Sequence, residues 1–194
     1  MPQDELRHYI RTYDGDLAPE VCARLLESFH ALPQLQQYNG RKLRRGLDQS
    51  EWTELNVSRL ADPHSRTMFR GLVDRAVERY NRDLALAIPV PNSPTTSDLI
   101  LKRYRPGGAE RFQLHFDSIH HVANRYLVVL WYLNDVAEGG ETRFPQLDVA
   151  VQPKAGRLLV FPPFWMYQHE AVPPVSGDKY ILSTYLLFTP TASV

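Results

Sequence analysis

The sequence has one cysteine, no net charge and no long apolar run. Because Cys22 is alone, no disulfide can form within the chain, which favours a reducing compartment. Lysine plus arginine and aspartate plus glutamate both number 22, so the overall charge does not attract the chain to nucleic acid or to an anionic membrane. No uncharged apolar stretch reaches the roughly 18 residues that a membrane-spanning helix needs, and the charged N-terminus indicates no signal peptide. We therefore expect a cytoplasmic protein that binds neither nucleic acid nor membrane.

What the sequence does contain is the composition of one folded domain. Its 194 residues, of which 43% are apolar and 23% charged, suffice for a single substantial core. We predict one domain over residues 1–194, with a helical support region at 1–97 and a β-rich core at 98–190. A local excess of charge is interpreted as the solvated face of a loop; it is the basic run Arg41, Lys42, Arg44 and Arg45. Nothing in the sequence predicts the oligomeric state.

Two helices are predicted in the first part of the chain. The first has Asp16 as its cap and Pro19 in its first turn, and its apolar residues recur at helical spacing: Val21, Leu25, Leu26 and Phe29. The second opens at Asp62, continues along an apolar face and ends before Pro89. Residues 34–60 are polar and mixed, and predict no particular element.

From residue 98 onward, short β-type runs are separated by proline, glycine, asparagine and aspartate. Eight strands are predicted: Leu99–Tyr104, Arg111–Phe116, Tyr126–Leu133, Thr142–Phe144, Leu147–Val151, Leu158–Phe161, Tyr167–Glu170 and Tyr180–Phe188. With no helix between them they are expected to pair antiparallel, and eight such strands most economically form a jelly roll or small barrel. We therefore predict an α+β, mainly β fold whose N-terminal helices buttress one sheet.

A first pair of candidate metal ligands lies at the predicted strand Arg111–Phe116. Residues two apart on a strand face the same side, so His115 and Asp117 are expected to project together. One imidazole and one carboxylate are two of the three ligands of a 2-His-1-carboxylate site, which needs a second histidine from elsewhere. On its own the pair is a weak signal, because a surface histidine beside an aspartate is common.

His169 is the candidate for that second imidazole, although a histidine among aromatic residues is usually part of a core. Ten residues later, Lys179 opens the last strand, which is otherwise uncharged. A lysine that faces inward there needs a buried anionic partner. Alternation along the strand places Lys179, Ile181, Ser183 and Tyr185 on one face, so an ammonium and a hydroxyl are available to receive the carboxylate of a ligand.

In order and spacing, these residues resemble the signature of the prolyl 4-hydroxylase-like branch of the Fe(II)- and 2-oxoglutarate-dependent dioxygenases. Further blocks match in the same order: R-Y-x-P-G at 103–107, R…Y-L-N from Arg125 to Asn134, G-G-E-T-x-F-P at 139–145 and G-x-x-L-x-F at 156–161. The resemblance covers residues 99–188, about half of the chain. It implies a double-stranded β-helix, which is the jelly roll that the strand pattern predicts.

The resemblance also implies a role for each matching residue. His115, Asp117 and His169 would bind Fe(II), and Lys179 would pair with the distal carboxylate of 2-oxoglutarate. Tyr104 would assist Lys179, with three further candidates: Thr142, Tyr132 and Ser183. Three protein ligands leave three coordination positions, which 2-oxoglutarate and O₂ occupy in the family. The products would be succinate, CO₂ and a substrate hydroxylated at an unactivated carbon, with ascorbate as a candidate reductant.

Two positions depart from the family pattern. Val128 stands where the family often has a threonine, which removes one polar contact to the cosubstrate. Tyr185 stands where many prolyl hydroxylases have a tryptophan. A phenol is smaller than an indole and adds a hydroxyl, so the substrate pocket is expected to differ here. Arg111 is a second substrate-side candidate, since it shares the face of His115 if the strand is regular.

Several functions remain open from the sequence. Within the oxygenase class, the substrate is a prolyl residue of a peptide or protein, a proline-like or other free amino acid, or an unrelated small molecule. Outside that class, a non-catalytic jelly-roll module or a cupin-type metalloenzyme could hold a metal on the same triad. Lys179 argues against both, because such a site does not need a buried ammonium facing the metal. Asp117 argues against halogenation, since chloride would need its position.

Overall fold

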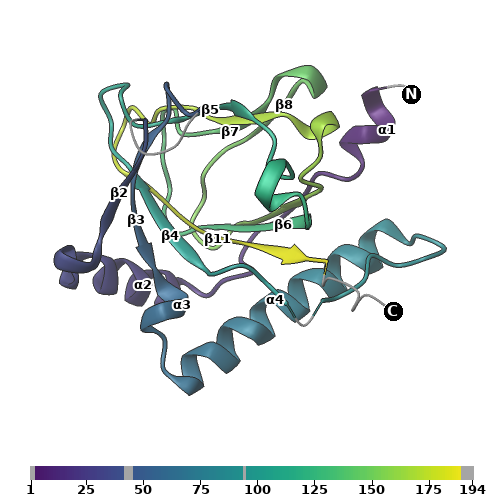
Figure 1. Ribbon diagram of the computed structural model, residues 1–194, viewed down its shortest axis with the longest axis horizontal. Coiled ribbons are helices and arrows are strands. Elements are labelled where there is room, and N and C mark those ends of the chain that lie inside the picture. Colours follow the sequence, from purple (N-terminus) through teal and green to yellow (C-terminus); the bar gives the residue numbers. More distant parts are fainter. Residues whose placement is uncertain (1–2, 42–45, 94, 189–194) are drawn as a thin grey trace.

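The computed structural model describes residues 3–41, 46–93 and 95–188, and two antiparallel sheets form its centre (Figure 1). The major sheet has the order β1 (Arg11–Tyr13), β9 (Leu158–Phe161), β6 (Arg125–Tyr132), β11 (Lys179–Leu187), β4 (Ile100–Tyr104), β3 (Glu51–Asn56), β2 (Gln37–Gly40). The minor sheet has the order β5 (Phe112–His115), β10 (His169–Ala171), β7 (Thr142–Phe144), β8 (Val149–Val151). The sheets face each other as a double-stranded β-helix, so the predicted jelly roll is confirmed.

The described ranges contain eleven strands, more than the eight predicted. The predicted strands correspond to β4–β11, and the additional ones are β1, β2 and β3. Strand β3 pairs with β4 and β2 pairs with β3, so the stretch 34–60 extends the major sheet at one edge, while β1 pairs with β9 at the other. The first 97 residues therefore contribute sheet as well as the predicted helices, and the unassigned stretch 34–60 supplies two of these three strands.

Two predicted strands begin later than expected, because a short 3-10 helix comes first. Helix η3 (Pro145–Leu147) precedes β8, and η4 (Trp165–Tyr167) precedes β10. Two further 3-10 turns are η1 (Pro33–Leu35) and η2 (His120–Val122). Of the basic run, Arg41 pairs with Glu51 at 2.7 Å, whereas Lys42, Arg44 and Arg45 lie outside the described residues.

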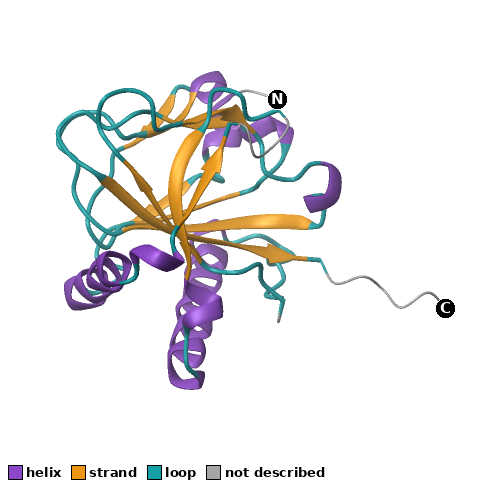
Figure 2. Cartoon of the chain, turned by 60° about the vertical axis from the view of Figure 1, so that its left-hand side comes forward, coloured by secondary structure: helices purple, strands orange, loops and turns teal. Residues whose placement is uncertain are grey.

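Helices α2 (Pro19–Ala31) and α4 (Pro63–Leu84) cover the outer face of the major sheet (Figures 1 and 2). Helix α4 is capped as predicted, because Asp62 Oδ1 accepts a hydrogen bond from the Ser65 amide at 2.7 Å. Helix α2 is not: its cap residue is Ala18, and Asp16 instead accepts a hydrogen bond from Trp131 Nε1 at 2.9 Å. The short helices are α1 (Gln3–Arg7) and α3 (Val57–Leu60). In the described part of the chain, no helix has the length and apolar character to cross a membrane.

The major sheet separates two cores, because successive residues of β11 face opposite sides. Tyr180, Leu182 and Leu186 face the helices and belong to the outer core. Ile181 and Tyr185 face the minor sheet and belong to the inner core, which also contains large aromatic side chains: Tyr104, Tyr132, Phe144 and Phe161. The predicted inward face of the last strand therefore lies between the two sheets.

Candidate active site

Two histidines meet across the minor sheet. Strands β5 and β10 pair His115 directly with His169, and the centroids of their rings are 4.3 Å apart. Each ring is oriented by a main-chain carbonyl two residues earlier. His115 Nδ1 lies 2.7 Å from Gln113 O, and His169 Nδ1 lies 3.0 Å from Tyr167 O. With Nδ1 donating to these carbonyls, Nε2 of each ring carries the lone pair that can bind a metal.

Asp117 lies in the turn after β5, where its amide donates a hydrogen bond to Pro163 O at 3.0 Å. This turn brings its carboxylate to both imidazoles. Oδ1 is 3.5 Å from His115 Nε2, and Oδ2 is 3.4 Å from His169 Nε2. His115 and Asp117 thus lie on one side, as predicted, although a turn rather than strand periodicity places the carboxylate.

The two oxygens of Asp117 have different surroundings. Oδ1 accepts a hydrogen bond from the Tyr185 hydroxyl at 2.8 Å. Oδ2 is buried and has no hydrogen-bond donor among the described residues. The candidate ligand atoms of His115, Asp117 and His169 all lie within 4.8 Å of one another. A buried anionic oxygen that faces two imidazole nitrogens fits a divalent cation such as Fe(II).

The protonation states of this triad also suit a metal. Burial raises the pKa of the Asp117 carboxyl, but His169, His115 and Arg125 outweigh burial and hold the pKa well below its usual range. Burial, reinforced by His115 and opposed by Asp117, lowers the pKa of His169 to about 4. At neutral pH the site therefore offers a carboxylate and, at His169, a neutral imidazole, which are the forms that bind metal ions.

Lys179 lies between the sheets in the same cavity as the triad. It is opposite Tyr104 in the β11–β4 pairing and only 1% exposed. Burial lowers its pKa to about 7, while Glu141 acts in the opposite direction and Lys102 reinforces burial. Its ammonium lies 5.4 Å and 5.6 Å from the ring centroids of Tyr104 and Tyr132. A buried amine in this state would be stabilised in its charged form by a bound carboxylate.

The other predicted cosubstrate residues surround Lys179. We call the cavity that holds Lys179 and the triad the inner cavity, and Tyr104, Thr142 and Ser183 line it. Tyr132 stands behind Thr142 and donates a hydrogen bond to its Oγ1 at 2.6 Å. The turn before Thr142 needs glycine: Gly139 has φ of 73°, and a Cβ there would lie 2.5 Å from Pro173 O.

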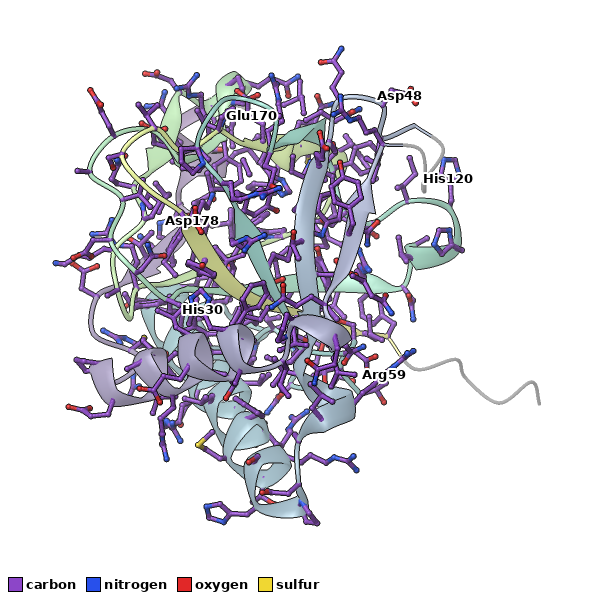
Figure 3. All side chains as sticks on the ribbon, turned by 90° about the vertical axis from the view of Figure 1, so that its left-hand side faces the viewer. His30, Asp48, Arg59, His120, Glu170 and Asp178 are labelled. Carbon is purple, nitrogen blue, oxygen red and sulfur yellow. The ribbon has the colours of Figure 1, made fainter. Side chains whose placement is uncertain are left out.

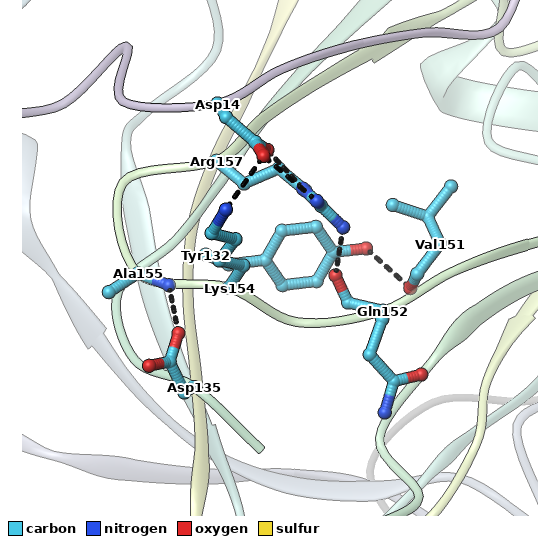
Figure 4. Close-up of polar contacts among 8 residues, drawn as sticks. All are labelled: Asp14, Tyr132, Asp135, Val151, Gln152, Lys154, Ala155 and Arg157. Carbon is cyan, nitrogen blue, oxygen red and sulfur yellow. Dashed lines mark hydrogen bonds and ion pairs between the residues drawn. The ribbon is translucent and has the colours of Figure 1, made fainter. Parts of the chain in front are cut away.

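The wall behind Tyr132 is tied to the N-terminal part of the chain (Figure 4). Asp14 accepts hydrogen bonds from Arg157 Nε at 2.6 Å and Lys154 Nζ at 2.8 Å. Arg157 also donates to Gln152 O at 2.9 Å. These contacts fix the connection from β8 to β9, and so hold in place the strands that flank the cosubstrate residues.

A wider cavity of about 590 Å³, which we call the outer groove, adjoins the inner cavity. Both are lined by Lys102, Phe112, Asp117, Ser183 and Tyr185. The groove is further lined by Trp52, Glu54, Asn56, Arg59, Asp98 and Arg125. Apart from Asp117, Ser183 and Tyr185, none of these residues is predicted as a site residue. Alternation on β4 could have indicated Lys102, which lies two residues before Tyr104 and thus on the same face.

The two substrate-side candidates have different positions. Tyr185 lines both cavities. Arg111 lines neither of them; it lies just before β5, where its main chain pairs with Glu51. Its guanidinium lies 3.4 Å from Glu170. Figure 3 shows Glu170 far from Arg59, which lines the outer groove. The position of Arg111 therefore gives no support to a role beside the substrate.

Comparison with known proteins agrees with this geometry. Residues 99–187, which include the triad and Lys179, match the model of the 2OG-Fe(II) oxygenase superfamily. This part of the chain is similar to the 2OG-Fe(II) oxygenase superfamily. The resemblance seen in the sequence motifs is confirmed, and so are the iron and 2-oxoglutarate that the family name states.

Relatives of the domain are prolyl hydroxylases. The chain is 34% identical over 106 residues to the probable prolyl 4-hydroxylase 11 of Arabidopsis thaliana, covering 50% of this chain and 36% of that protein. The chain spans less than half the length of the curated relatives it matches.

Two solved structures share the fold over nearly the whole chain. A prolyl-4-hydroxylase from Pseudomonas putida has a TM-score of 0.68 at 19% identity, with 97% of each chain covered. A prolyl hydroxylase from Trichoplax adhaerens, in complex with a hypoxia inducible factor peptide fragment, has a TM-score of 0.72 at 17% identity, with 96% of this chain and 87% of that chain covered. At such low identity these structures show the fold alone.

Proposed function

We propose that the chain is an Fe(II)- and 2-oxoglutarate-dependent dioxygenase that hydroxylates a prolyl residue of a peptide. The observation that carries this proposal is one cavity in which a buried lysine and a 2-His-1-carboxylate triad with an unsatisfied carboxylate oxygen face the same space. A structural metal site explains the triad but not Lys179, since burial alone makes an ammonium unfavourable there.

Each residue has a task that follows from its surroundings. His115, Asp117 and His169 would hold Fe(II), which when bound supplies the oxidising chemistry on O₂ and 2-oxoglutarate. Lys179 would hold the distal carboxylate of 2-oxoglutarate through a charge-assisted hydrogen bond. Tyr104 and Ser183 would shape and close the same space, and Tyr132 would keep the Thr142 hydroxyl oriented by its hydrogen bond.

The outer groove is the proposed binding site of the substrate. It reaches the triad at Asp117, beside Tyr185, and extends to Arg59 and Asp98. This length suits an extended peptide better than a single free amino acid. The relatives named prolyl 4-hydroxylase and the Trichoplax adhaerens enzyme with its bound peptide support the same substrate class.

The test is anaerobic binding of Fe(II) and 2-oxoglutarate to the purified chain, followed by succinate measurement in air. Prolyl peptides, free L-proline and other free amino acids are compared as substrates, with mass spectrometry to detect the added oxygen. We expect succinate formation that rises with a prolyl peptide and a product heavier by one oxygen atom. Stimulation by free amino acids alone would contradict the peptide assignment, and no 2-oxoglutarate turnover under any condition would contradict the oxygenase assignment.

A further inference from the structure

The hydrogen bond between Tyr185 and Asp117 joins the last strand of the major sheet to the candidate metal centre. The Tyr185 hydroxyl donates to Asp117 Oδ1 at 2.8 Å. Asp117 is buried, whereas Tyr185 is half-buried and lines both the inner cavity and the outer groove. The contact therefore places a hydroxyl donor of the major sheet on one oxygen of a candidate metal ligand.

Tyr185 is held through both its ring and its main chain, which fixes the position of its hydroxyl. The guanidinium of Arg125 lies 3.8 Å from the ring centroid. The main chain of Tyr185 is also held in place. Its amide donates a hydrogen bond to Ser97 Oγ at 3.1 Å, and its carbonyl accepts one from the Ser97 amide at 2.9 Å. Directly across on β6 stands Val128, a small apolar residue that brings no competing donor or acceptor.

The consequence for Asp117 is that its two oxygens are not equivalent. Oδ1 is occupied by the phenol, and the buried Oδ2, 3.4 Å from His169 Nε2, has no hydrogen-bond donor among the described residues. A carboxylate that bound the metal through both oxygens would take a fourth coordination position. With one oxygen engaged elsewhere, the three protein ligands take three positions and leave three for other ligands.

We propose that Tyr185 is a positioning residue that fixes Asp117 so that Oδ2 alone binds the metal. The inference rests on the proposed function, since it concerns the same metal centre. The sequence alone predicts that Tyr185 contributes to substrate recognition. The proposed role, positioning a metal ligand, is distinct from that. Hydrogen-bond partners of metal ligands typically change metal affinity by about 10–100-fold when they are removed.

The experiment measures the dissociation constant of Co(II), used as an air-stable substitute for Fe(II), in the full chain without any substrate. Tyr185→Phe removes only the hydroxyl and should weaken Co(II) binding by about 10–100-fold. The matched control is Tyr80→Phe, which removes a buried phenol hydroxyl of the outer core that donates to Tyr9 O and contacts no candidate ligand. It should leave Co(II) affinity unchanged. Thermal melting of each variant checks that the fold is retained.

A double-mutant cycle separates positioning from general loosening of the core. In an Asp117→Ala background there is no carboxylate to position, so the Tyr185→Phe penalty on Co(II) binding should vanish. If the single variant does not fold, Tyr185→Trp keeps the aromatic bulk and moves the donor, and it should weaken Co(II) binding in the same Asp117-dependent way.

The outcomes distinguish this inference from the proposed function. A wild-type chain that binds no Co(II) would contradict the metal centre itself. A wild type that binds Co(II), with Tyr185 variants that bind it equally well or that lose the same affinity in the Asp117→Ala background, would overturn only the role of Tyr185.

Discussion

The inner cavity and the outer groove meet at Asp117 and Tyr185, but different parts of the chain build them. The inner cavity draws its residues from β4–β7 and β9–β11, all within the part that matches the oxygenase family. The outer groove adds β2, β3, α3 and the segment before β4, which lie wholly or largely outside that match. The match to the family therefore includes the whole lining of the inner cavity, while the residues that line only the outer groove lie mostly outside it.

The two regions also differ in how their charges are treated. In the inner cavity Asp117 and Lys179 are at most 5% exposed. Because the dielectric constant is low there, removing the partner of either charge changes its electrostatic energy strongly. In the outer groove Asp98 and Arg59 pair at 3.8 Å with side chains 51% and 76% exposed, where water screens charge. Substitutions in the inner cavity should accordingly have large effects on chemistry, and those in the groove should have small effects on substrate preference.

The largest effect is expected at the triad. His115→Ala, Asp117→Ala and His169→Ala each remove one of three candidate ligands and should abolish iron-dependent succinate formation, with little change in the folded structure. The control is His121→Ala, in the exposed η2 turn, which should retain activity. Succinate assays and circular dichroism check this prediction, and near wild-type turnover in any one triad variant would remove that residue from the site.

Lys179→Ala should have the next largest effect. A charge-assisted hydrogen bond to a carboxylate contributes about 1.5–3 kcal/mol, so the KM for 2-oxoglutarate should rise by about ten- to a hundredfold, while Co(II) affinity barely changes. The matched control is Lys154→Ala, whose ammonium is half exposed and pairs with Asp14 at 2.8 Å. Arg157 still binds Asp14 in this variant, so the KM for 2-oxoglutarate should not change. An unchanged dependence on 2-oxoglutarate would favour a structural metal site instead.

The same lysine predicts a pH dependence of cosubstrate binding. Because the pKa of Lys179 is lowered to about 7 in the free protein, the amine is largely neutral above that pH. A bound carboxylate raises the pKa, so binding takes up a proton and the Kd for 2-oxoglutarate should rise about tenfold per pH unit above neutrality. Lys179→Arg should bind with much less pH dependence, since arginine stays charged. Calorimetry of anaerobic complexes between pH 6 and 9 measures the effect, and a flat profile in the wild type would show that Lys179 stays protonated.

The sequence predicts the inner cavity well because two kinds of local order agree there. Alternation along the last strand places Lys179 and Ser183 inward, and the motif blocks name the residues on neighbouring strands. The sequence predicts the outer groove poorly, for a physical reason. Strand β3 is an interior strand of the major sheet only because β4 lies beside it, and that partner is more than 40 residues away in the chain, so residues 51–56 show no local pattern of their own.

Asp16 and Tyr185 show the same limit at single positions. Asp16 stands where a helix cap is expected, yet its carboxylate accepts a hydrogen bond from Trp131, which is far along the chain. Tyr185 is predicted to face the site and does, but its partner Asp117 sits in a turn held by Pro163. The sequence predicts the inward face of Tyr185 correctly and the capping role of Asp16 wrongly, and in both cases the bonding partner depends on tertiary contacts that no periodicity encodes.

The smallest effect is expected at the rim of the outer groove, and it tests whether that groove binds the substrate. Asp98→Asn removes a charge but keeps an oxygen that can accept the hydrogen bond from Asn56 Nδ2, 2.7 Å in the wild type. Rim charges contribute roughly 0.2–1 kcal/mol, so the KM of a prolyl peptide that carries lysine beside the proline should rise about two- to fivefold at low salt. The KM of the matching glutamate peptide should fall slightly, and 2-oxoglutarate turnover without peptide should not change. The matched control is Asp148→Asn, an acid with a 95% exposed side chain that lines neither cavity. If both variants treat the two peptides alike, the substrate does not pass Asp98, and its path to Tyr185 must lie along another part of the groove.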